Sequence, residues 1–468
     1  MKALFPELVQ ELKSILGEEW VVTEKEAILK YLFDETAPFV RPKPCEEVVV
    51  VKPSSSIEVA EVMKLANKYR VPVYPRGGGT GLVGGAVPTK PGIVLSLERM
   101  DKLVVDAENM VAEAEAGVTL GKLIEEAEKR GLSFPPHPGD EGATVGGLIA
   151  CNAGGARAVR TGVMRNYVLG LEVVLPQGAI LSLGSKTVKN NLGFNLAHLF
   201  IGSEGILGVI TKAYLRLYPR WRASATIVVP FERRRSAMNT AKKILFSGLT
   251  PLALEYFDRR VIEESARHLG VAWPVAEGNS YLMLILAECS EDIVFAELEM
   301  LSKIFETERA LEPVIAQRSD EQSTLLKIRS AIYTALKKET FDILDTTVPL
   351  GAIDAFLESV ERLESRYKVW LPVYGHVGDG NVHVHVLQYP GFTVHQLEEI
   401  RGQIYEAAVA LGGVITGEHG IGAIRKSYVA KHLSPEWVKV MKELKRSLDP
   451  NNILNPDKVL PVDEGLRG

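Results

Sequence analysis

The sequence predicts an α+β protein built from more than one domain. Its 468 residues exceed what one hydrophobic core usually organises, and 46% hydrophobic with 24% charged residues is typical of a globular protein. In the first half, short strand patterns alternate with short helical ones. Near residues 215–225 the pattern changes, and longer helical patterns then alternate with strands. This change favours a second α+β domain with an antiparallel sheet.

The first half begins with short helices up to about residue 40 and continues with strands bounded by glycine, proline or charge. A helix is predicted near Ile57–Tyr69, after a turn of proline and serines, and another over residues 118–131, with Gly131 as its stop signal. The predicted strands are Glu47–Val51, Val71–Tyr74, Gly92–Ser96, Met110–Ala114 and Glu172–Leu175.

In the second half, the alternating patterns run through SAMNTAKKILFSG, LEYFDRRVIEESARHLG, YLMLILAEC and DIVFAELEMLSKIFETE. The last stretch is helical from about residue 430 to Leu448 and then turns through DPNNILNPDK. We therefore expect the chain to have three parts, which cover about residues 1–218, 219–425 and 426–468.

Charge and cysteine content disfavour several classes of protein. The formal net charge of -5 lacks the basic excess of a nucleic-acid binder. Cys45, Cys151 and Cys289 form no CxxC pair, which disfavours a disulfide framework, a zinc ribbon, a haem attachment or an iron–sulfur cluster. The amino terminus is amphipathic, and no uncharged apolar run reaches the roughly 18 residues of a membrane span. We expect a cytoplasmic protein, peripheral at a membrane only through a partner.

The segment PRGGGTGLVGG contains a GxGxxG pattern, Gly79–Gly84, after a predicted strand. A Rossmann dinucleotide site needs a helix that begins inside this motif. Pro88 and Pro91, which follow directly, exclude a regular helix there, so we reject a Rossmann unit. The glycines still permit positive φ angles and leave successive amide N–H groups unshielded. The loop therefore predicts an anion-binding nest, with a tight turn as the alternative.

Two more glycine-rich segments lie in the same half. One covers residues 137–178 and begins HPGDEGATVGG, and the other, GSEGILGVIT at 202–211, runs into a strand. Any one of the three segments is compatible with simple turns. Three of them beside strands indicate a large cofactor that lies across loops.

Four of the nine histidines lie in two short motifs, YGHVGDGNVHVH and GEHG. In the alternating strand VHVHV, His383 and His385 share a face, and the GDGN turn lets His376 fold back towards His383. Two imidazoles and a carboxylate make a divalent-metal set with open positions for substrate. We select His376, His383 and Glu418 as ligands; the alternative is that these histidines are hydrogen-bonded core residues.

His419 stands next to a ligand and is predicted to be a general base. A metal-bound hydroxyl has a lowered pKa, and a neutral imidazole can then accept its proton. Asn381 and His385 are second choices for substrate contact. Asp379 is expected to be a turn residue.

The motifs PRGGGTGLVGGAVP, TVGGLIACNAGG and GSEGILGVIT resemble the flavin-binding domain of vanillyl-alcohol-oxidase-type flavoproteins. The most similar branch contains D-lactate dehydrogenases, D-2-hydroxyglutarate dehydrogenases and the FAD subunit of glycolate oxidase. The resemblance extends from about residue 40 to the C terminus. It implies a two-part FAD-binding domain over residues 1–218, a substrate or cap domain with the metal and catalytic motifs over 219–425, and a C-terminal helical segment, 426–468, that returns to the FAD domain.

The resemblance also implies residue roles in binding FAD. The pyrophosphate would lie on Arg76, Gly77, Gly78, Gly79, Thr80, Gly81 and Leu82. The flavin and ribityl chain would be lined by Pro136, Gly139, Thr144, Gly146, Gly147, Asn152 and Gly155. The adenine side would be held by Gly162, Val209 and Ile210, and Pro75 and Asn455 complete the expected set. Some relatives attach flavin covalently; His137 is expected to pack or hydrogen-bond instead.

His376, His383 and Glu418 match the GHxGDGNxH and GEHG pattern that the dehydrogenase branch uses as a metal site beside the flavin, and we expect a divalent ion, Zn, Fe or Mn, in this chain. Arg329 matches an arginine that relatives use to bind the substrate carboxylate, a task that suits a bidentate guanidinium. Relatives that oxidise 2-hydroxyglutarate carry a lysine near the position of Ile343 or Leu344. Its absence favours D-lactate or glycolate.

The implied reaction is oxidation of a small D-2-hydroxy acid to its 2-oxo acid, with hydride transfer to flavin N5. Because the chain encodes no second redox centre, we expect an external acceptor: an electron-transfer flavoprotein, an iron–sulfur subunit, a cytochrome or a quinone. One alternative is a non-redox lyase or transferase resembling alkylglycerone-phosphate synthase, which would not need the metal set. Another is a non-catalytic flavin-carrying subunit, which would not need His419.

Overall fold

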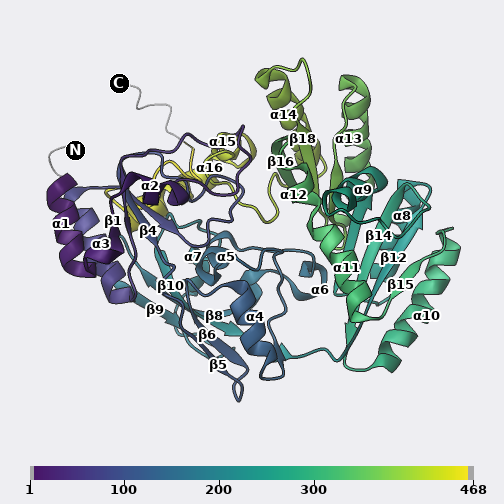
Figure 1. The fold of residues 1–468 in the computed structure, drawn as a ribbon, viewed down its shortest axis with the longest axis horizontal. Coiled ribbons are helices and arrows are strands. Elements are labelled where there is room, and N and C mark those ends of the chain that lie inside the picture. Colours follow the sequence, from purple (N-terminus) through teal and green to yellow (C-terminus); the bar gives the residue numbers. More distant parts are fainter. Residues whose placement is uncertain (1–4, 462–468) are drawn as a thin grey trace.

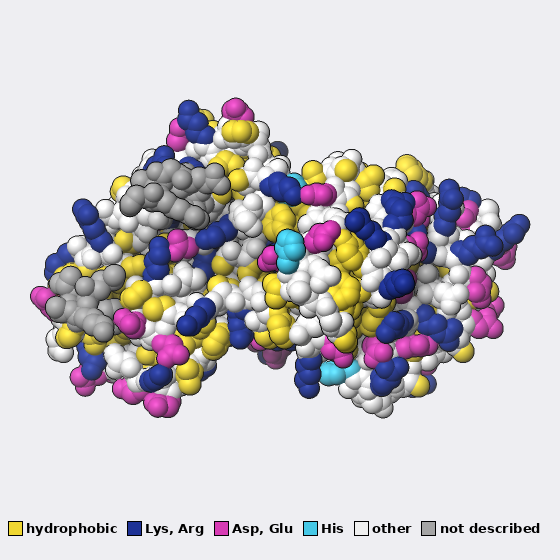
Figure 2. Space-filling model, turned by 90° about the horizontal axis from the view of Figure 1, so that it is seen from above, with side chains coloured by type: hydrophobic (Ala, Val, Ile, Leu, Met, Phe, Trp, Pro, Cys, Tyr) yellow, Lys and Arg dark blue, Asp and Glu magenta, His cyan; other side chains and the backbone are white. Residues whose placement is uncertain are grey.

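A computed structural model describes residues 5–461, whose elements form two sheet-containing halves (Figure 1). The purple and blue half contains a four-stranded and a five-stranded sheet, and the teal and green half is built on a seven-stranded sheet. Within residues 5–461, no helix is both long enough and apolar enough to cross a membrane. Basic and acidic side chains are intermixed over the face shown in Figure 2.

The four-stranded sheet has the order β1-β2-β4-β3, in which β2, β4 and β3 are parallel. Helix α3 (Ser56–Tyr69) joins β2 to β3 and begins where the Ser55 hydroxyl accepts the Glu58 amide. Helix α1 (Phe5–Leu16) packs its apolar face on α3. The strands are β1 (Val21–Val22), β2 (Val48–Val51), β4 (Gly92–Ser96) and β3 (Val73–Arg76).

Strand β3 begins two residues later than the predicted Val71–Tyr74. The amide of Val71 still closes the end of α3 by donating to the Ala66 carbonyl at 2.9 Å, so the extended backbone starts only after Pro72. Residues 77–91, all described, contain no helix between β3 and β4. The rejection of a Rossmann unit on the basis of Pro88 and Pro91 is therefore confirmed.

The five-stranded sheet is antiparallel throughout, with the order β5-β6-β10-β8-β9. Helices α4 (Leu120–Glu128) and α5 (Val145–Cys151) bury their apolar sides against it. Short helices α6 (Ala158–Thr161) and α7 (Ala197–Phe200) and a ribbon of β7 (Leu132–Ser133) with β11 (Tyr218–Pro219) complete this region. The strands are β5 (Leu103–Asp106), β6 (Val111–Glu115), β10 (Val209–Arg216), β8 (Val168–Val174) and β9 (Ile180–Gly184).

The seven-stranded sheet has the order β15-β12-β14-β13-β17-β18-β16, and all its pairings are antiparallel. This confirms the expected antiparallel sheet of the second half. The segment LEYFDRRVIEESARHLG divides into a strand and a helix, because its first residues alternate between the two faces of the sheet. The strands are β12 (Ala223–Phe231), β13 (Ala253–Asp258), β14 (Ser280–Glu288), β15 (Val314–Ala316), β16 (Thr340–Thr347), β17 (Val373–His376) and β18 (Asn381–Leu387).

Helices cover both faces of this sheet. One face packs in a large apolar core on α8 (Arg234–Phe246), α10 (Glu291–Thr307), α13 (Ile353–Tyr367) and α14 (Val394–Ala410). The other packs in a separate cluster on α9 (Arg259–His268), α11 (Ser319–Ser330) and α12 (Ile332–Leu336). The second face is the one that carries the polar residues described below.

After α15 (Lys426–His432) and α16 (Pro435–Leu448), the chain lies against the four-stranded sheet. The amide of Val73 on β3 donates to the Ile453 carbonyl, and the amide of Asn455 donates to the Val73 carbonyl, each at 2.7 Å. The C-terminal segment thus extends the edge of the sheet at the strand that leads into the first glycine loop.

Candidate functional site

Strand alternation gathers polar side chains on one face of the seven-stranded sheet. On β18, Val382, Val384 and Val386 enter the large apolar core, so His383 and His385 point to the opposite face. The same rule places Asp345 on that face of β16, His376 on that of β17 and Glu255 on that of β13. Neighbouring strands thus bring groups together that are far apart in the sequence.

The three predicted metal ligands lie together. The Nε2 atom of His376 is 3.5 Å and that of His383 is 3.4 Å from the same carboxylate oxygen of Glu418. The two histidines belong to the β17–β18 hairpin, whose turn holds Gly380 at a φ of 88°. Asp379 acts within that turn, where its carboxylate accepts the amide of Asn381 at 3.1 Å.

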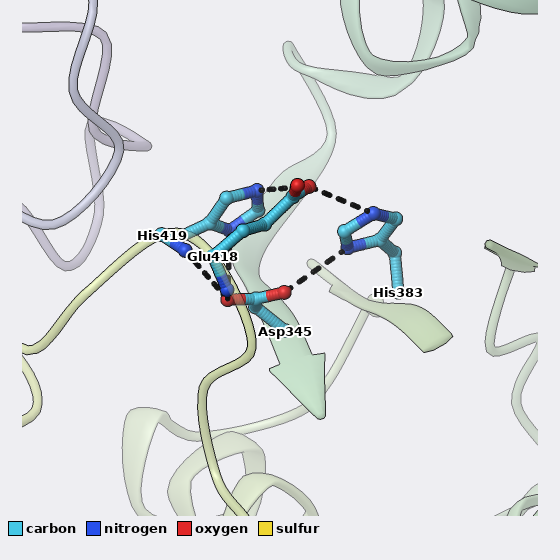
Figure 3. Close-up of side chains that lie close together, drawn as sticks. All are labelled: Asp345, His383, Glu418 and His419. Atoms are coloured by element: carbon cyan, nitrogen blue, oxygen red, sulfur yellow. Dashed lines mark hydrogen bonds and ion pairs between the residues drawn. The ribbon is translucent and has the colours of Figure 1, made fainter. Parts of the chain in front are cut away.

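Asp345, which the sequence analysis missed, holds the loop that carries Glu418 and His419 (Figure 3). One of its oxygens accepts the amides of Gly417, Glu418 and His419 at 2.7–2.9 Å, and the other accepts the Asn381 amide group at 2.8 Å. Donor atoms of Asp345, His383, Glu418 and His419 lie within 4.8 Å of one another. Because the Asp345 oxygens already accept these hydrogen bonds, Asp345 orients the backbone of the cluster.

Glu255, also missed from the sequence, joins the cluster to Arg329. One oxygen of this buried carboxylate lies 2.5 Å from His376 Nδ1, and the other accepts Arg329 Nε at 2.7 Å. The Arg329 side chain is 14% exposed and lies over the Tyr374 ring. The predicted clamp is therefore beside the predicted ligands, with part of its guanidinium open to the cavity.

Burial and charge set the protonation of the cluster. Burial lowers the pKa of His383 to about 3. Burial would raise the pKa of Glu418, but the neighbouring histidines outweigh it and the pKa falls to about 2. Burial would lower the pKa of His376, yet the carboxylates of Glu255 and Glu418 outweigh it and raise that pKa well above its usual range. At neutral pH, His383 is thus neutral and Glu418 ionised, the forms that bind a metal ion, whereas His376 carries a proton that a metal ion would have to displace.

A cavity of about 1460 Å³ extends from the cluster to the glycine loops. It exceeds the roughly 300–1,000 Å³ of ordinary small-ligand pockets and therefore has room for a large cofactor together with a small substrate. His376, His383, Glu418, His419 and Arg329 line one end. The residues predicted to bind the cofactor that line it are Pro75, Arg76, Gly77, Gly78, Gly79, Thr80, Gly81, Leu82, Gly139, Thr144, Gly146, Gly147, Gly155, Val209, Ile210 and Asn455.

The two glycine segments meet at backbone distance, as a cofactor cradle requires. A Cβ on Gly78 would lie 2.7 Å from the Gly142 carbonyl oxygen of the second segment. Within that second segment, a Cβ on Gly155 would lie 2.3 Å from the His137 carbonyl oxygen. Among the described residues, the buried hydroxyl of Thr144 has no hydrogen-bond partner, and it lines the cavity. The site thus offers a free hydroxyl and unshielded backbone, which fit a pyrophosphate or a flat ring.

Several predicted site residues lie elsewhere. Pro136, Asn152 and Gly162 do not line the cavity; the Asn152 side chain accepts the amide of Arg165 instead. His385 is fully buried, its ring nitrogens within hydrogen-bonding distance of Thr340 and Tyr374. Asn381 donates to Asp345 and to neighbouring groups on β16. His385 and Asn381 therefore support the cluster from behind and do not reach the cavity.

Both missed carboxylates left a signal in the sequence. Glu255 interrupts the apolar stretch ALEYF, and Asp345 lies in the strand-like stretch FDILDTT. An unpaired carboxylate inside a sheet is costly, so each of these residues needs a partner. The partners of these two carboxylates could not be identified from the sequence, because they lie on other strands, on α11 or in the loop after α14.

Comparisons with known proteins agree with this architecture. Residues 48–184 match the family "FAD binding domain", and residues 220–459 match "FAD linked oxidases, C-terminal domain". Among solved structures, p-cresol methylhydroxylase shares the fold with a TM-score of 0.79 and 18% identity, covering 98% of each chain. Alkyldihydroxyacetonephosphate synthase does so with a TM-score of 0.76 and 21% identity, covering 96% of this chain and 84% of the other. The expected vanillyl-alcohol-oxidase-type fold is confirmed.

Curated relatives are similar over nearly the whole chain. D-lactate dehydrogenase of Archaeoglobus fulgidus is 47% identical over 430 residues, which are 92% of this chain and 95% of the relative. D-lactate dehydrogenase of Anaerostipes hadrus is 35% identical over 97% of each chain. Glycolate oxidase subunit GlcD of Bacillus subtilis is 34% identical over 89% of this chain and 90% of the relative. The chain therefore belongs to the family of FAD-linked oxidases that contains these hydroxy-acid dehydrogenases.

Proposed function

We propose that this protein uses FAD to oxidise a small D-2-hydroxy acid, D-lactate or glycolate, to the 2-oxo acid. The observation that carries this proposal is the cluster of His376, His383, Glu418 and His419 at one end of a cavity that the glycine loops also line. Arg329 at the same end supplies the cation that a carboxylate substrate needs. The names of the relatives support the same reaction.

In this proposal, residues 1–218 with the returning segment 426–468 bind FAD, and residues 219–425 form the substrate domain. The amides of residues 77–82 and the free hydroxyl of Thr144 would hold the pyrophosphate. Gly146, Gly147 and Gly155 line the cavity, and their backbone would lie beside the flavin. When bound, FAD supplies a hydride acceptor at N5.

His376, His383 and Glu418 would hold a divalent ion, Zn, Fe or Mn, whose charge lowers the pKa of a hydroxyl beside it. Glu255 supports this set by its contact with His376 Nδ1, which directs the other ring nitrogen towards Glu418. Asp345 supports it by fixing the backbone of Glu418.

His419 would accept the hydroxyl proton of the substrate. Its side chain is 13% exposed, its Nε2 lies 3.7 Å from Glu418, and its ring stacks on His383 with centroids 5.2 Å apart. This keeps the base in contact with the ligand set while it faces the cavity. Arg329 would bind the substrate carboxylate and so direct the D-hydroxyl towards His419.

The apolar wall beside the cluster favours a short substrate. Ile343 lines the cavity near the cluster, while Leu344 points into the apolar core. Met283 and Ile285 add further apolar wall. A second carboxylate, as in 2-hydroxyglutarate, would meet an apolar surface at Ile343, whereas the methyl group of lactate is compatible with it.

Turnover with an artificial electron acceptor tests this function. The enzyme should reduce this acceptor with D-lactate or glycolate as substrate and should not reduce it with L-lactate. D-2-hydroxyglutarate should be a poor substrate. The variant His383→Ala should retain FAD, lose bound metal and lose turnover. Turnover of L-lactate at the rate of D-lactate, or full activity of His383→Ala, would contradict the proposal. Electrons leave to an external acceptor, which we propose to be a protein or quinone partner.

A further inference from the structure

The loop of residues 416–422 has an unusual set of backbone hydrogen bonds. Its amides at residues 417, 418 and 419 donate to Asp345, and the amide of Gly420 donates to the Thr416 hydroxyl at 3.0 Å. The next two amides, of residues 421 and 422, donate to the two carboxylate oxygens of Glu204, each at 2.7 Å. Side-chain oxygens thus accept six successive amides in a segment without regular secondary structure.

The two carboxylates that hold this loop come from different halves of the molecule. Asp345 belongs to β16 of the seven-stranded sheet, whereas Glu204 lies in the turn between α7 and β10 of the first half. Glu204 is itself fixed there: its amide donates to the Ala150 carbonyl of α5 at 2.8 Å, and its carbonyl accepts the Asn455 side chain at 2.9 Å. Helix α5 also carries Gly146 and Gly147 of the cavity wall.

Close packing explains the two glycines that follow His419. Gly420 has a φ of 87°, and a Cβ there would lie 2.9 Å from the carboxylate of Glu204. Gly422 has a φ of 51°, and a Cβ there would lie 2.2 Å from the carbonyl oxygen of Val83 in the first glycine loop. The loop therefore lies on the first half at both points, and any side chain at either position would move it away.

From this geometry we infer that Glu204 is a positioning residue, which ties the loop bearing Glu418 and His419 to the half of the molecule that binds the flavin. Asp345 fixes the loop relative to the metal ligands, and Glu204 fixes it relative to the cofactor cradle. A hydride and a proton leave neighbouring atoms of the substrate, so the base and the flavin must keep a fixed separation. This inference rests on the proposed function.

The variant Glu204→Gln tests the inference with little change in volume. Its amide group presents N–H to one of the two loop amides, so at least one hydrogen bond is lost. We expect FAD content and metal content to be unchanged. In anaerobic stopped-flow mixing with D-lactate, the limiting rate of flavin reduction should fall tenfold or more, since small displacements of a catalytic group reduce rates strongly. The half-saturating concentration should change less than twofold, because Arg329 still binds the carboxylate.

Hydrogen–deuterium exchange gives a readout that needs no substrate. The peptide covering residues 417–424 should exchange faster in Glu204→Gln than in the wild type, with the rest of the first half unchanged. The matched control is Glu364→Gln. Glu364, like Glu204, is a half-buried carboxylate that accepts a backbone amide, that of Leu371, at 2.7 Å. Unlike Glu204, it does not line the cavity. This control should reduce its flavin at the wild-type rate. Should Glu204→Gln not fold, Glu204→Asp, too short to reach both amides, takes its place.

Three results would overturn the inference. Unchanged exchange at residues 417–424 together with an unchanged limiting rate would show that the tie has no effect. Loss of FAD from Glu204→Gln would make Glu204 a cofactor contact. An equal loss of rate in Glu364→Gln would indicate general destabilisation. If no hydroxy acid reduces the wild-type flavin, the proposed function fails, while the exchange experiment still decides whether Glu204 holds the loop.

Discussion

Replacing Glu255 with glutamine should weaken both metal binding and substrate binding. Glu255 is 1% exposed and pairs with two cationic groups, the His376 ring and the Arg329 guanidinium. Glutamine keeps the volume of the side chain but removes its charge. His376 then loses the partner that raises its pKa and orients its ring, and Arg329 loses the partner that holds its guanidinium at the edge of the cavity.

The magnitude follows from the contacts. Removing the partner of a metal-ligating histidine typically lowers metal affinity about 10–100-fold. Removing one member of a buried ion pair costs about 3–5 kcal/mol of unfolding free energy, and we expect the lower end because Arg329 is 14% exposed to the cavity. We therefore predict a metal dissociation constant raised 10–100-fold, an unfolding free energy lower by about 3 kcal/mol, and a higher KM for D-lactate.

The assay is competition for the metal between the protein and a chelator of known affinity, with urea unfolding in parallel. The matched control is Glu288→Gln. Glu288 pairs with Arg160 at 2.8 Å on β14 of the same sheet, but it contacts no histidine and does not line the cavity. The control should lose some stability and keep the wild-type metal affinity. Equal metal affinity in Glu255→Gln and wild type would refute the assignment of Glu255 as the support of His376.

Three further outcomes are expected. His419→Ala should keep FAD and metal but slow flavin reduction by D-lactate by about 10²–10⁴-fold in stopped-flow mixing, and normal turnover would end its assignment as the base. Gly78→Ala should lose FAD affinity, measured by flavin fluorescence, because its Cβ would lie 2.7 Å from the Gly142 carbonyl; Gly402→Ala, with open space around its Cβ, should not. Burial raises the pKa of Asp258 from 3.8 to about 6, so the folded state binds this proton more tightly than the unfolded state does. The unfolding free energy should therefore fall by up to about 3 kcal/mol as the pH rises from 3.8 to about 6. Asp258→Asn should flatten that part of the urea-unfolding profile, and an unchanged slope would contradict the assignment.

Local sequence signals located several strands of the first half and correctly excluded a Rossmann unit, but they missed β5 and β9 and covered only the end of β8. The strand at Gly92–Ser96 has the predicted bounds, and the prolines at positions 88 and 91 excluded a helix. Errors arose where a neighbour decides the boundary. The end of α3 takes the amide of Val71 and delays β3. The residues ALEYFD alternate as a strand does, but it is their pairing with β14 and β17 that fixes where β13 ends and α9 begins.

Some residues of the candidate site could likewise be predicted from local motifs, and others could not. Sequence motifs sufficed to group His376, His383 and Glu418, since two lie in one hairpin and the third in a glycine-flanked motif. Glu255 and Asp345 required contacts between distant strands and loops. His385 was expected to contact substrate because it shares a face with its neighbour two residues earlier. Its ring is instead covered by Thr340 and Tyr374, which only the packed sheet brings together.

The most direct test of the central claim is the visible spectrum of the purified holoenzyme under anaerobic conditions. Addition of D-lactate should bleach the flavin band, L-lactate should leave it intact, and prior removal of the metal with a chelator should abolish bleaching without releasing FAD. These results together would establish the cofactor, the stereochemistry of the substrate and the need for the site of His376, His383 and Glu418. A flavin band that no 2-hydroxy acid bleaches would contradict the proposed oxidation.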